Sequence, residues 1–230
     1  AYYDIVDIFD RVNNDGTNVI GFMLGNGWYS QPSINLGPNM IKIILYIQYE
    51  DGSLDLVTTN EDNWYQGEGP IRYNDIYNGE YYDATKETPG WLRPGYDTTK
   101  WKKASIIKNP TIGTLRSSAI MPISRKVESY SARSVSQPMQ GIFVVDFGQN
   151  VAGFTTITIP GNYLRGHNVT IMHSEELQQD GFINNMWPEK APMMFNISLR
   201  GDGNPEVYEA FFTFFGYQYA QIIGYPGVLD

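Results

Sequence analysis

The 230-residue sequence has no cysteine and only two histidines, His167 and His173. Without cysteine, disulfides, thiolate nucleophiles and cysteine-ligated zinc are excluded. Two histidines leave little room for a histidine-based metal site or a Ser-His-Asp triad. Basic residues number 16 against 25 acidic ones, so the basic footprint of a nucleic-acid binder is missing. No run reaches the roughly 18 apolar residues of a membrane span, and the first residues show no signal-peptide pattern.

Aromatic residues, glycine and proline are abundant. The chain holds 17 Tyr, 23 Gly and 13 Pro, and aromatic residues make up 14% of it. Such a composition favours short strands separated by tight turns over long helices. The length corresponds to about one and a half domains of roughly 150 residues. We therefore expect a folded all-β protein with one or two domains.

The clearest strand signal lies between residues 41 and 59. Apolar side chains alternate over 41–49, Glu50-Asp51-Gly52-Ser53 is a turn signal, and 54–59 returns as a second strand. Residues 18–24 also indicate a strand. Residues 60–103 are polar, aromatic and irregular, which is typical of a loop-rich stretch.

The second half shows a regular series of short strands. The predicted strands are separated by Gly, Pro and Asn turns and cover 143–147, 154–159, 168–174, 207–215 and 217–223. Turns every 8–12 residues are typical of a β-sandwich or barrel. A shift in composition over 104–118 indicates a crossover between two domains.

Several strings, in a fixed order, carry a family resemblance. They are Gly25-Asn26-Gly27-Trp28-Tyr29, Asn74-Asp75-Ile76-Tyr77-Asn78-Gly79-Glu80, Asp146-Phe147-Gly148-Gln149-Asn150, His173-Ser174-Glu175, Phe212-Thr213 and Gly216-Tyr217-Gln218-Tyr219. In this order they resemble the non-catalytic N-terminal β-sandwich region of bacterial-type α-L-rhamnosidases, glycoside hydrolase family 78. Two positions depart from the family pattern, with Phe215 and Gln218 where a His and an Arg are usual.

The resemblance implies a domain order. Residues 1–103 would form a jelly-roll-like domain that is incomplete at its N-terminus, 104–118 a linker, and 119–227 a concanavalin-like β-sandwich. The (α/α)6 barrel that carries the family's catalytic carboxylates would be absent from this chain. Hydrolysis of a glycosidic bond needs a pair of carboxyl groups flanking it, and the sequence nominates none. We therefore expect the chain to be inactive alone and leave open whether a longer parent is an enzyme.

The implied function is an accessory region of an α-L-rhamnosidase-like glycoside hydrolase. Its partners would be the missing barrel of the same protein and rhamnose-containing glycans, at an extracellular or cell-surface location. A stand-alone carbohydrate-binding module is one alternative. A structural or surface-assembly protein that reuses these sandwiches is another.

The acidic and aromatic stretch 75–83, predicted to be a loop, is the best candidate for a sugar site. Carboxylates and amides hydrogen-bond to sugar hydroxyls, and aromatic rings stack on the apolar face of a pyranose. The candidate sugar-binding residues are Trp28, Tyr29, Trp64, Asp75, Tyr77, Asn78, Glu80 and Asp83. The alternative is that the carboxylates cap backbone N–H groups and tie the loop down. Because oxygen-rich loops suit Ca²⁺, calcium is a further alternative, although no ligand pattern matches.

The remaining candidates favour structural roles. Asp146, Gln149 and Asn150 are expected to form a buried network at a bulge or at an interface with the missing barrel. His173 and Glu175, two residues apart on a predicted strand, would share one face; a structural hydrogen bond is favoured over acid–base chemistry. Asn168-Val169-Thr170 and Asn196-Ile197-Ser198 are glycosylation sequons.

Overall fold

The computed structural model describes residues 17–31, 34–108, 126–184 and 191–229. In these ranges the regular structure consists of strands and one 3-10 turn, η1 (Ala84–Lys86), which confirms the all-β prediction. The chain divides into two compact units, each interleaved in sequence. The hairpin unit comprises Ala1–Leu24, Met40–Glu68 and Pro89–Arg125, and the sheet unit comprises Gly25–Asn39, Gly69–Thr88 and Lys126–Asp230.

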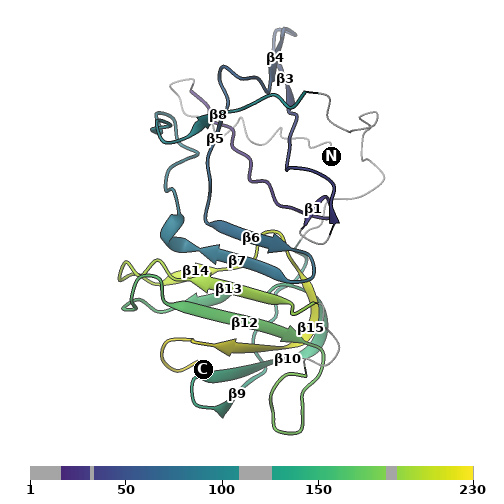
Figure 1. Cartoon of the computed structure of the whole chain (residues 1–230), viewed down its shortest axis with the longest axis vertical. Helices are drawn as coiled ribbons and strands as arrows, with labels where there is room; N and C mark the ends of the chain where they lie inside the picture. The colour runs from purple at the N-terminus through teal and green to yellow at the C-terminus, as the bar shows by residue number, and fades with distance from the viewer. Residues whose placement is uncertain (1–16, 32–33, 109–125, 185–190, 230) are drawn as a thin grey trace. The chain divides into compact units, whose positions relative to one another are not determined.

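A seven-stranded sheet organises the sheet unit (Figure 1). In spatial order its strands are β6 (Ile71–Asp75), β7 (Gly79–Asp83), β13 (Met194–Ser198), β12 (Asn168–Ser174), β15 (Phe215–Ile223), β10 (Ile142–Gly153) and β9 (Ser134–Met139). Neighbouring strands are antiparallel except for β7 and β13, which are parallel. Some neighbouring strands of this sheet lie far apart in the sequence. β6 and β7 come from the N-terminal half of the chain and extend a sheet whose other strands all come from the C-terminal half.

The core lies on one face of this sheet. Alternation along β12 buries Val169 and Ile171, and Ile197 of β13 joins them. A two-stranded sheet of β11 (Ile157–Ile159) and β14 (Glu206–Tyr208) contributes Ile159 and Tyr208 to the same cluster. Burial of each aliphatic side chain contributes roughly 1.5–3 kcal/mol, so the core stabilises this unit without disulfides.

Gly79 allows β7 to approach β13. It has a φ of 100°, and a Cβ at this position would collide with the carbonyl group of Met194. Only glycine combines this backbone conformation with so close an approach. The prediction that 75–83 is a loop was wrong: the stretch is the end of β6, a tight turn and β7. Its pairing with residues 194–198 is non-local and left no periodic signal.

The hairpin unit holds the predicted hairpin. β3 (Ile44–Gln48) pairs antiparallel with β4 (Leu54–Thr58), and Gly52 in the connecting turn has a φ of 82°. β5 (Tyr65–Gln66) pairs with β8 (Lys102–Lys103). Among the described residues of this unit no side chain is buried.

Two predicted strands differ from the structure. Residues 18–24 contain no strand, and Gly21 among them lies against the ring of Trp91, where a Cβ would collide. Of the strand predicted over 207–215, only residues 207–208 belong to β14 (Glu206–Tyr208), and β15 begins at Phe215; between them the backbone N–H of Phe211 donates to Glu80. Residues 71–83 lie in the sheet unit; the domains 1–103 and 119–227 and the linker 104–118 stay a prediction.

Candidate functional site

Three of the family strings meet in the sheet unit. The backbone N–H of Asn26 donates to Asn74 Oδ1 at 2.6 Å, and Asn26 Nδ2 donates to the Asn74 carbonyl at 2.7 Å. Gly25 lies against the ring of Phe212, where a Cβ would clash. Residues 25–28, 74–80 and 211–213, here called the motif junction, are thus linked although up to 188 positions separate them.

The buried side chain of Glu80 connects β7 to the 211–213 segment of the motif junction. Its side chain is 1% exposed, and its carboxylate accepts the backbone N–H groups of Phe211 at 3.0 Å and Phe212 at 2.8 Å. Burial raises the pKa of the Glu80 carboxyl, while the two amides oppose that shift. Glu80 therefore holds the 211–213 segment onto β7.

The other two carboxylates of the predicted sugar site also bind backbone. Asp75 Oδ1 accepts the N–H groups of Tyr77 and Asn78, both at 2.9 Å, and so shapes the turn between β6 and β7. Asp75 Oδ2 is enclosed and has no hydrogen-bond partner. Asp83 accepts from Thr85 N at 3.0 Å and caps η1. These contacts are the backbone-capping alternative raised by the sequence, and they leave sugar contact by the carboxylates a prediction.

The contacts of these three carboxylates also bear on whether the stretch 75–83 could bind calcium. Ca²⁺ takes six to eight oxygen ligands from converging side chains and carbonyls. Asp75, Glu80 and Asp83 instead serve three different sets of amides. Within the described ranges no three His, Asp or Glu side chains gather as a metal site. The stretch does not fit a calcium ligand set.

Exposed aromatic rings mark the outside of the junction. The Trp28 ring meets the Tyr77 ring edge-on at 5.5 Å and 86°, and the residues are 59% and 43% exposed. Asn78, also exposed, donates through Nδ2 to the Tyr73 hydroxyl at 3.1 Å. Tyr29 instead places its hydroxyl against Gly37. The structure thus brings Trp28, Tyr77 and Asn78 to the junction with their surfaces available.

Trp64 belongs to the hairpin unit, where its indole N–H donates to the Thr58 carbonyl at 3.0 Å. Its ring packs on Phe22 at 6.4 Å. These contacts give Trp64 a packing role within the hairpin unit, and sugar contact by Trp64 stays a prediction.

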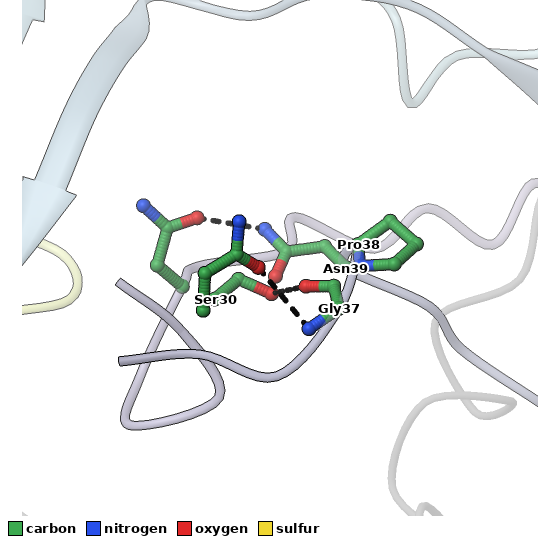
Figure 2. A pocket seen from close by; sticks show the side chains of 6 residues that line it. Ser30, Gly37, Pro38 and Asn39 are labelled. Carbon is green, nitrogen blue, oxygen red and sulfur yellow. Dashed lines mark hydrogen bonds between the residues drawn. The ribbon is translucent and has the colours of Figure 1, made fainter. Parts of the chain in front are cut away.

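A shallow hollow of about 540 Å³ opens beside the turn that carries Trp28. The turn is closed by Tyr29 N and Ser30 N, which both donate to the Asn26 carbonyl. Figure 2 shows the side chains of Ser30 and Asn39 and the backbone of Gly37 gathered around the space. The lining residues are Asn26, Ser30, Asn35, Gly37, Pro38 and Asn39. Asn26 was visible in the Gly-Asn-Gly string, whereas no signal pointed to Asn35 or Asn39.

A second group of polar residues surrounds a bulge in β10. Between Asp146, which pairs with Tyr219, and Val151, which pairs with Tyr217, β10 holds more residues than its partner. Asp146 Oδ1 accepts from Gly148 N at 2.7 Å and from Gln218 Nε2 at 3.0 Å.

The predicted network of Asp146, Gln149 and Asn150 is not buried, because the bulge turns Gln149 and Asn150 outward. Asn150 Nδ2 donates to Glu175 Oε1 at 2.9 Å. An interface role for this exposed group stays a prediction.

His173 is a core residue that does not pair with Glu175. It is 2% exposed, its Nδ1 donates to the Met193 carbonyl at 2.8 Å, and its Nε2 lies 3.0 Å from Thr155 Oγ1. Burial lowers the pKa of His173 to about 4, so the imidazole is neutral near pH 7. Glu175 lies beyond the end of β12 and is exposed, so the two side chains form no acid–base pair.

The two sequons face each other across β12 and β13. Ser198 Oγ donates to Asn168 Oδ1 at 2.6 Å, and Thr170 Oγ1 donates to Asn196 Oδ1 at 2.8 Å. Each asparagine is thus bound by the hydroxyl of the other sequon. These reciprocal bonds tie the strands together, and glycosylation at Asn168 or Asn196 stays a prediction.

Known protein families match both halves of the chain, including the strings that form the motif junction. Residues 1–127 match the alpha-L-rhamnosidase N-terminal domain, and residues 136–229 match the bacterial alpha-L-rhamnosidase concanavalin-like domain. The chain belongs to the alpha-L-rhamnosidase N-terminal domain family. The resemblance stated from the strings is confirmed, as is the prediction of two successive sandwich domains of this class.

Individual relatives agree. An alpha-L-rhamnosidase of Streptomyces avermitilis is 32% identical over 231 residues, covering 98% of this chain and 22% of that protein. One from Formosa agariphila is 29% identical over 97% of this chain and 24% of its own length. The chain spans less than a quarter of these curated relatives, to which it corresponds as an accessory β-sandwich region.

Solved structures show the same correspondence. The alpha-L-rhamnosidase from Dictyoglumus thermophilum superposes with a TM-score of 0.76 and 34% identity over 82% of this chain and 21% of that one. The Streptomyces avermitilis enzyme complexed with L-rhamnose superposes with a TM-score of 0.70 and is 33% identical. The match covers 81% of this chain and 18% of that one. Separately, none of the described segments forms a helix of the length and apolarity that crossing a membrane requires.

Proposed function

We propose that this chain is the part of an α-L-rhamnosidase-like glycoside hydrolase that supports a catalytic domain and contacts rhamnose-containing glycans. The observation that carries the supporting role is the motif junction. It fastens strands from residues 71–83 onto a sheet of the C-terminal half through Glu80 and Gly79, and Asn74 binds Asn26 to the same strands. An accessory region that must present a fixed surface to a neighbouring domain needs such long-range fastening.

A chimera tests the supporting role. In the Streptomyces avermitilis enzyme, the aligned region of 231 residues would be replaced by this chain. We expect a soluble chimera that hydrolyses an aryl α-L-rhamnoside, whereas deletion of the region abolishes soluble expression. The chain alone should release no aglycone. A deletion variant that keeps full stability and activity would overturn the supporting role.

Glycan contact is supported by a different observation, the exposed pair of Trp28 and Tyr77. Aromatic rings with one free face can stack on the apolar side of a sugar ring. Rhamnose is the sugar to test first, because the related Streptomyces avermitilis structure is complexed with L-rhamnose. Calorimetry of the chain with methyl α-L-rhamnopyranoside measures the contact directly, and absence of heat at millimolar sugar would contradict it.

The same proposal includes an extracellular or cell-surface location, where glycans of this kind are met. Fractionation of the source followed by peptide mass spectrometry of the secreted material tests the location. The same spectra would report glycans on Asn168 or Asn196. Peptides found only in the cytosolic fraction would contradict the location and leave the supporting role to the chimera.

A further inference from the structure

The motif junction contains two Asn-Gly pairs, Asn26-Gly27 and Asn78-Gly79. Asparagine before glycine is prone to deamidation, because glycine has no side chain to hinder its backbone nitrogen. In this reaction the glycine nitrogen loses its proton and bonds to the asparagine Cγ, the Cγ–Nδ2 bond breaks, and ammonia leaves. Water then opens the resulting succinimide ring to aspartate or isoaspartate. The fold decides which of the two pairs is able to react.

The Asn78-Gly79 pair is held by strands on both sides. Gly79 is buried and pairs with Asp75 of β6 and with Met194 of β13, and the Asn78 carbonyl accepts the N–H of Met194. Cyclisation draws the glycine nitrogen into a five-membered ring, which requires this backbone to leave the sheet. Central strands of a sheet open only together with much of their unit. The fold therefore suppresses the reaction at Asn78.

The Asn26-Gly27 pair lies in a turn outside the strands. Gly27 is exposed, has a φ of 49°, and leaves open the space where a Cβ would stand. The N–H groups of Tyr29 and Ser30 close the turn on the Asn26 carbonyl. The first N–H groups of such a helical turn have no partner within it. Solvent base can therefore reach the backbone nitrogen of Gly27.

Two hydrogen bonds hold the Asn26 carboxamide in place. Its Nδ2 donates to the Asn74 carbonyl at 2.7 Å, and its Oδ1 accepts from Asn39 Nδ2 at 2.9 Å. A single hydrogen bond of this kind adds only modestly to stability. Local opening of the turn therefore releases the carboxamide without unfolding the seven-stranded sheet, and the released Cγ is then open to attack by the Gly27 nitrogen.

The product is unable to restore the closed turn. A carboxylate accepts hydrogen bonds but donates none, so an aspartate at position 26 would set an oxygen against the Asn74 carbonyl oxygen where Nδ2 now donates. Isoaspartate would in addition lengthen the backbone of the turn by one methylene group. The reaction thus makes a reversible opening permanent.

We propose that Asn26-Gly27 is a site of spontaneous deamidation, and that its modification permanently detaches the turn 26–30 from β6. Asn78 keeps its amide in the folded chain. The inference concerns the chemistry of the chain itself and does not rest on the proposed function.

The test incubates the folded 230-residue chain at mildly alkaline pH. Peptide mapping by tandem mass spectrometry follows deamidation, and electron-transfer fragmentation identifies isoaspartate. Asn78 is the matched control, because it is the same dipeptide in the same molecule. Asn26 should react at least about tenfold faster than Asn78, a difference of roughly 1.4 kcal/mol in the barrier. In urea the two sites should react at similar rates, since both pairs are then free of the fold.

Two variants test the mechanism. Asn39→Ala removes one of the two bonds that hold the carboxamide, so Asn26 should react about three- to tenfold faster. The rate at Asn78 should not change. Gly27→Ala should slow the reaction at Asn26 about tenfold or more, because the added Cβ hinders the attacking nitrogen. Circular dichroism checks that each variant folds.

Asn26→Asp reproduces one of the products. The amides of Tyr29 and Ser30, which close the turn, should exchange hydrogen about tenfold faster than in the wild-type chain, and those of β12 should not change. Asn63→Asp adds the same charge at an exposed position of the hairpin unit and should leave both sets of amides as they are.

Two outcomes would overturn the site. One is an Asn78 that reacts as fast as Asn26 in the folded chain, and the other is an Asn26 that stays intact in the folded chain while both sites react in urea. A rate at Asn26 that is the same in Asn39→Ala and in the wild-type chain would overturn the opening step. Unchanged exchange at Tyr29 and Ser30 in Asn26→Asp would overturn the detachment of the turn.

Discussion

Two hairpins with strands of equal length differ in how they are built into the fold: β3 and β4 form a two-stranded sheet, whereas β6 and β7 belong to the seven-stranded sheet. Within the described residues β3 and β4 pair only with each other, and their outer side chains Ile44, Tyr46, Leu54 and Leu56 are 45% to 61% exposed. β6 and β7 continue through the parallel pairing of β7 with β13 into a seven-stranded sheet, where Asn74, Asp75 and Glu80 are buried. An isolated two-stranded hairpin is marginally stable in water, so only the second hairpin can position a site rigidly.

The comparison shows that hydrophobicity alone does not decide which hairpin becomes integral. The first hairpin is rich in Ile and Leu, while the second reads Ile-Arg-Tyr-Asn-Asp and Gly-Glu-Tyr-Tyr-Asp. What incorporates the second is a glycine that allows close approach and a carboxylate that binds two distant amides. Substitutions at these positions, matched in the first hairpin, can break the comparison.

The largest effect is expected for Gly79→Ala. An added Cβ would meet the backbone carbonyl of Met194, and the φ of 100° would disfavour alanine as well. We expect a loss of about 4 kcal/mol or more in the free energy of unfolding, measured with urea. The control is Gly52→Ala in the first hairpin, where φ is 82° but the space is open and about 1 kcal/mol is expected. Equal losses at the two glycines would contradict the close approach of β7 to β13.

Glu80→Ala is expected to cost about 3–4 kcal/mol. It leaves the N–H groups of Phe211 and Phe212 without their acceptor, and each unsatisfied amide costs roughly 1–3 kcal/mol. Glu80→Gln should recover part of the loss, because one oxygen remains. Asp55→Ala, which removes an exposed bond to Tyr49 in the first hairpin, should cost about 0.5 kcal/mol or less in the same urea titration. A Glu80→Ala loss as small as this would mean that the 211–213 segment is held by other contacts.

Acid should destabilise the sheet unit through His173. Its pKa is about 4 in the folded chain and 6.5 when unfolded, so protons bind the unfolded state first as the pH falls. Stability is therefore lost between about pH 6.5 and 4, by about 2 kcal/mol at pH 5. The raised pKa of Glu80 acts in the opposite sense, because its contribution is lost as the pH rises.

The histidine effect is isolated by comparing urea unfolding at pH 7 and pH 5. His173→Gln should lower stability at pH 7 and remove most of the difference between the two pH values. His167→Gln, at the other histidine of the chain, should leave the difference in place. A His173→Gln variant with the same difference in stability between the two pH values as the wild-type chain would refute the buried, neutral state of His173.

Sequence patterns predicted whatever depends on local periodicity and turn chemistry. The alternation over 41–49 predicted β3, the turn at Gly52 predicted its return, and the strand predicted over 168–174 became β12. The family strings identified Asn26, Tyr77 and Glu80 as residues of interest. Their order along the chain carried no information about which strings meet in space.

What could not be predicted depends on long-range contacts. β7 shows no alternation because one of its neighbours, β13, comes from a distant segment and its Glu80 is buried against the amides of Phe211 and Phe212. Asn39 has no local pattern either, and only the hydrogen bond to Asn26 reveals its place in the hollow.

Native-state hydrogen exchange, read residue by residue by NMR, tests most directly whether β7 is part of the seven-stranded sheet. The account predicts that hydrogen-bonded amides in 79–83 exchange only on global unfolding of the sheet unit, together with those of β12 and β13. Amides of β3 and β4 should exchange faster, through local opening. Amides in 79–83 that exchange as fast as those in 54–58 would contradict the account, because β7 would then be no firmer than the hairpin it is compared with.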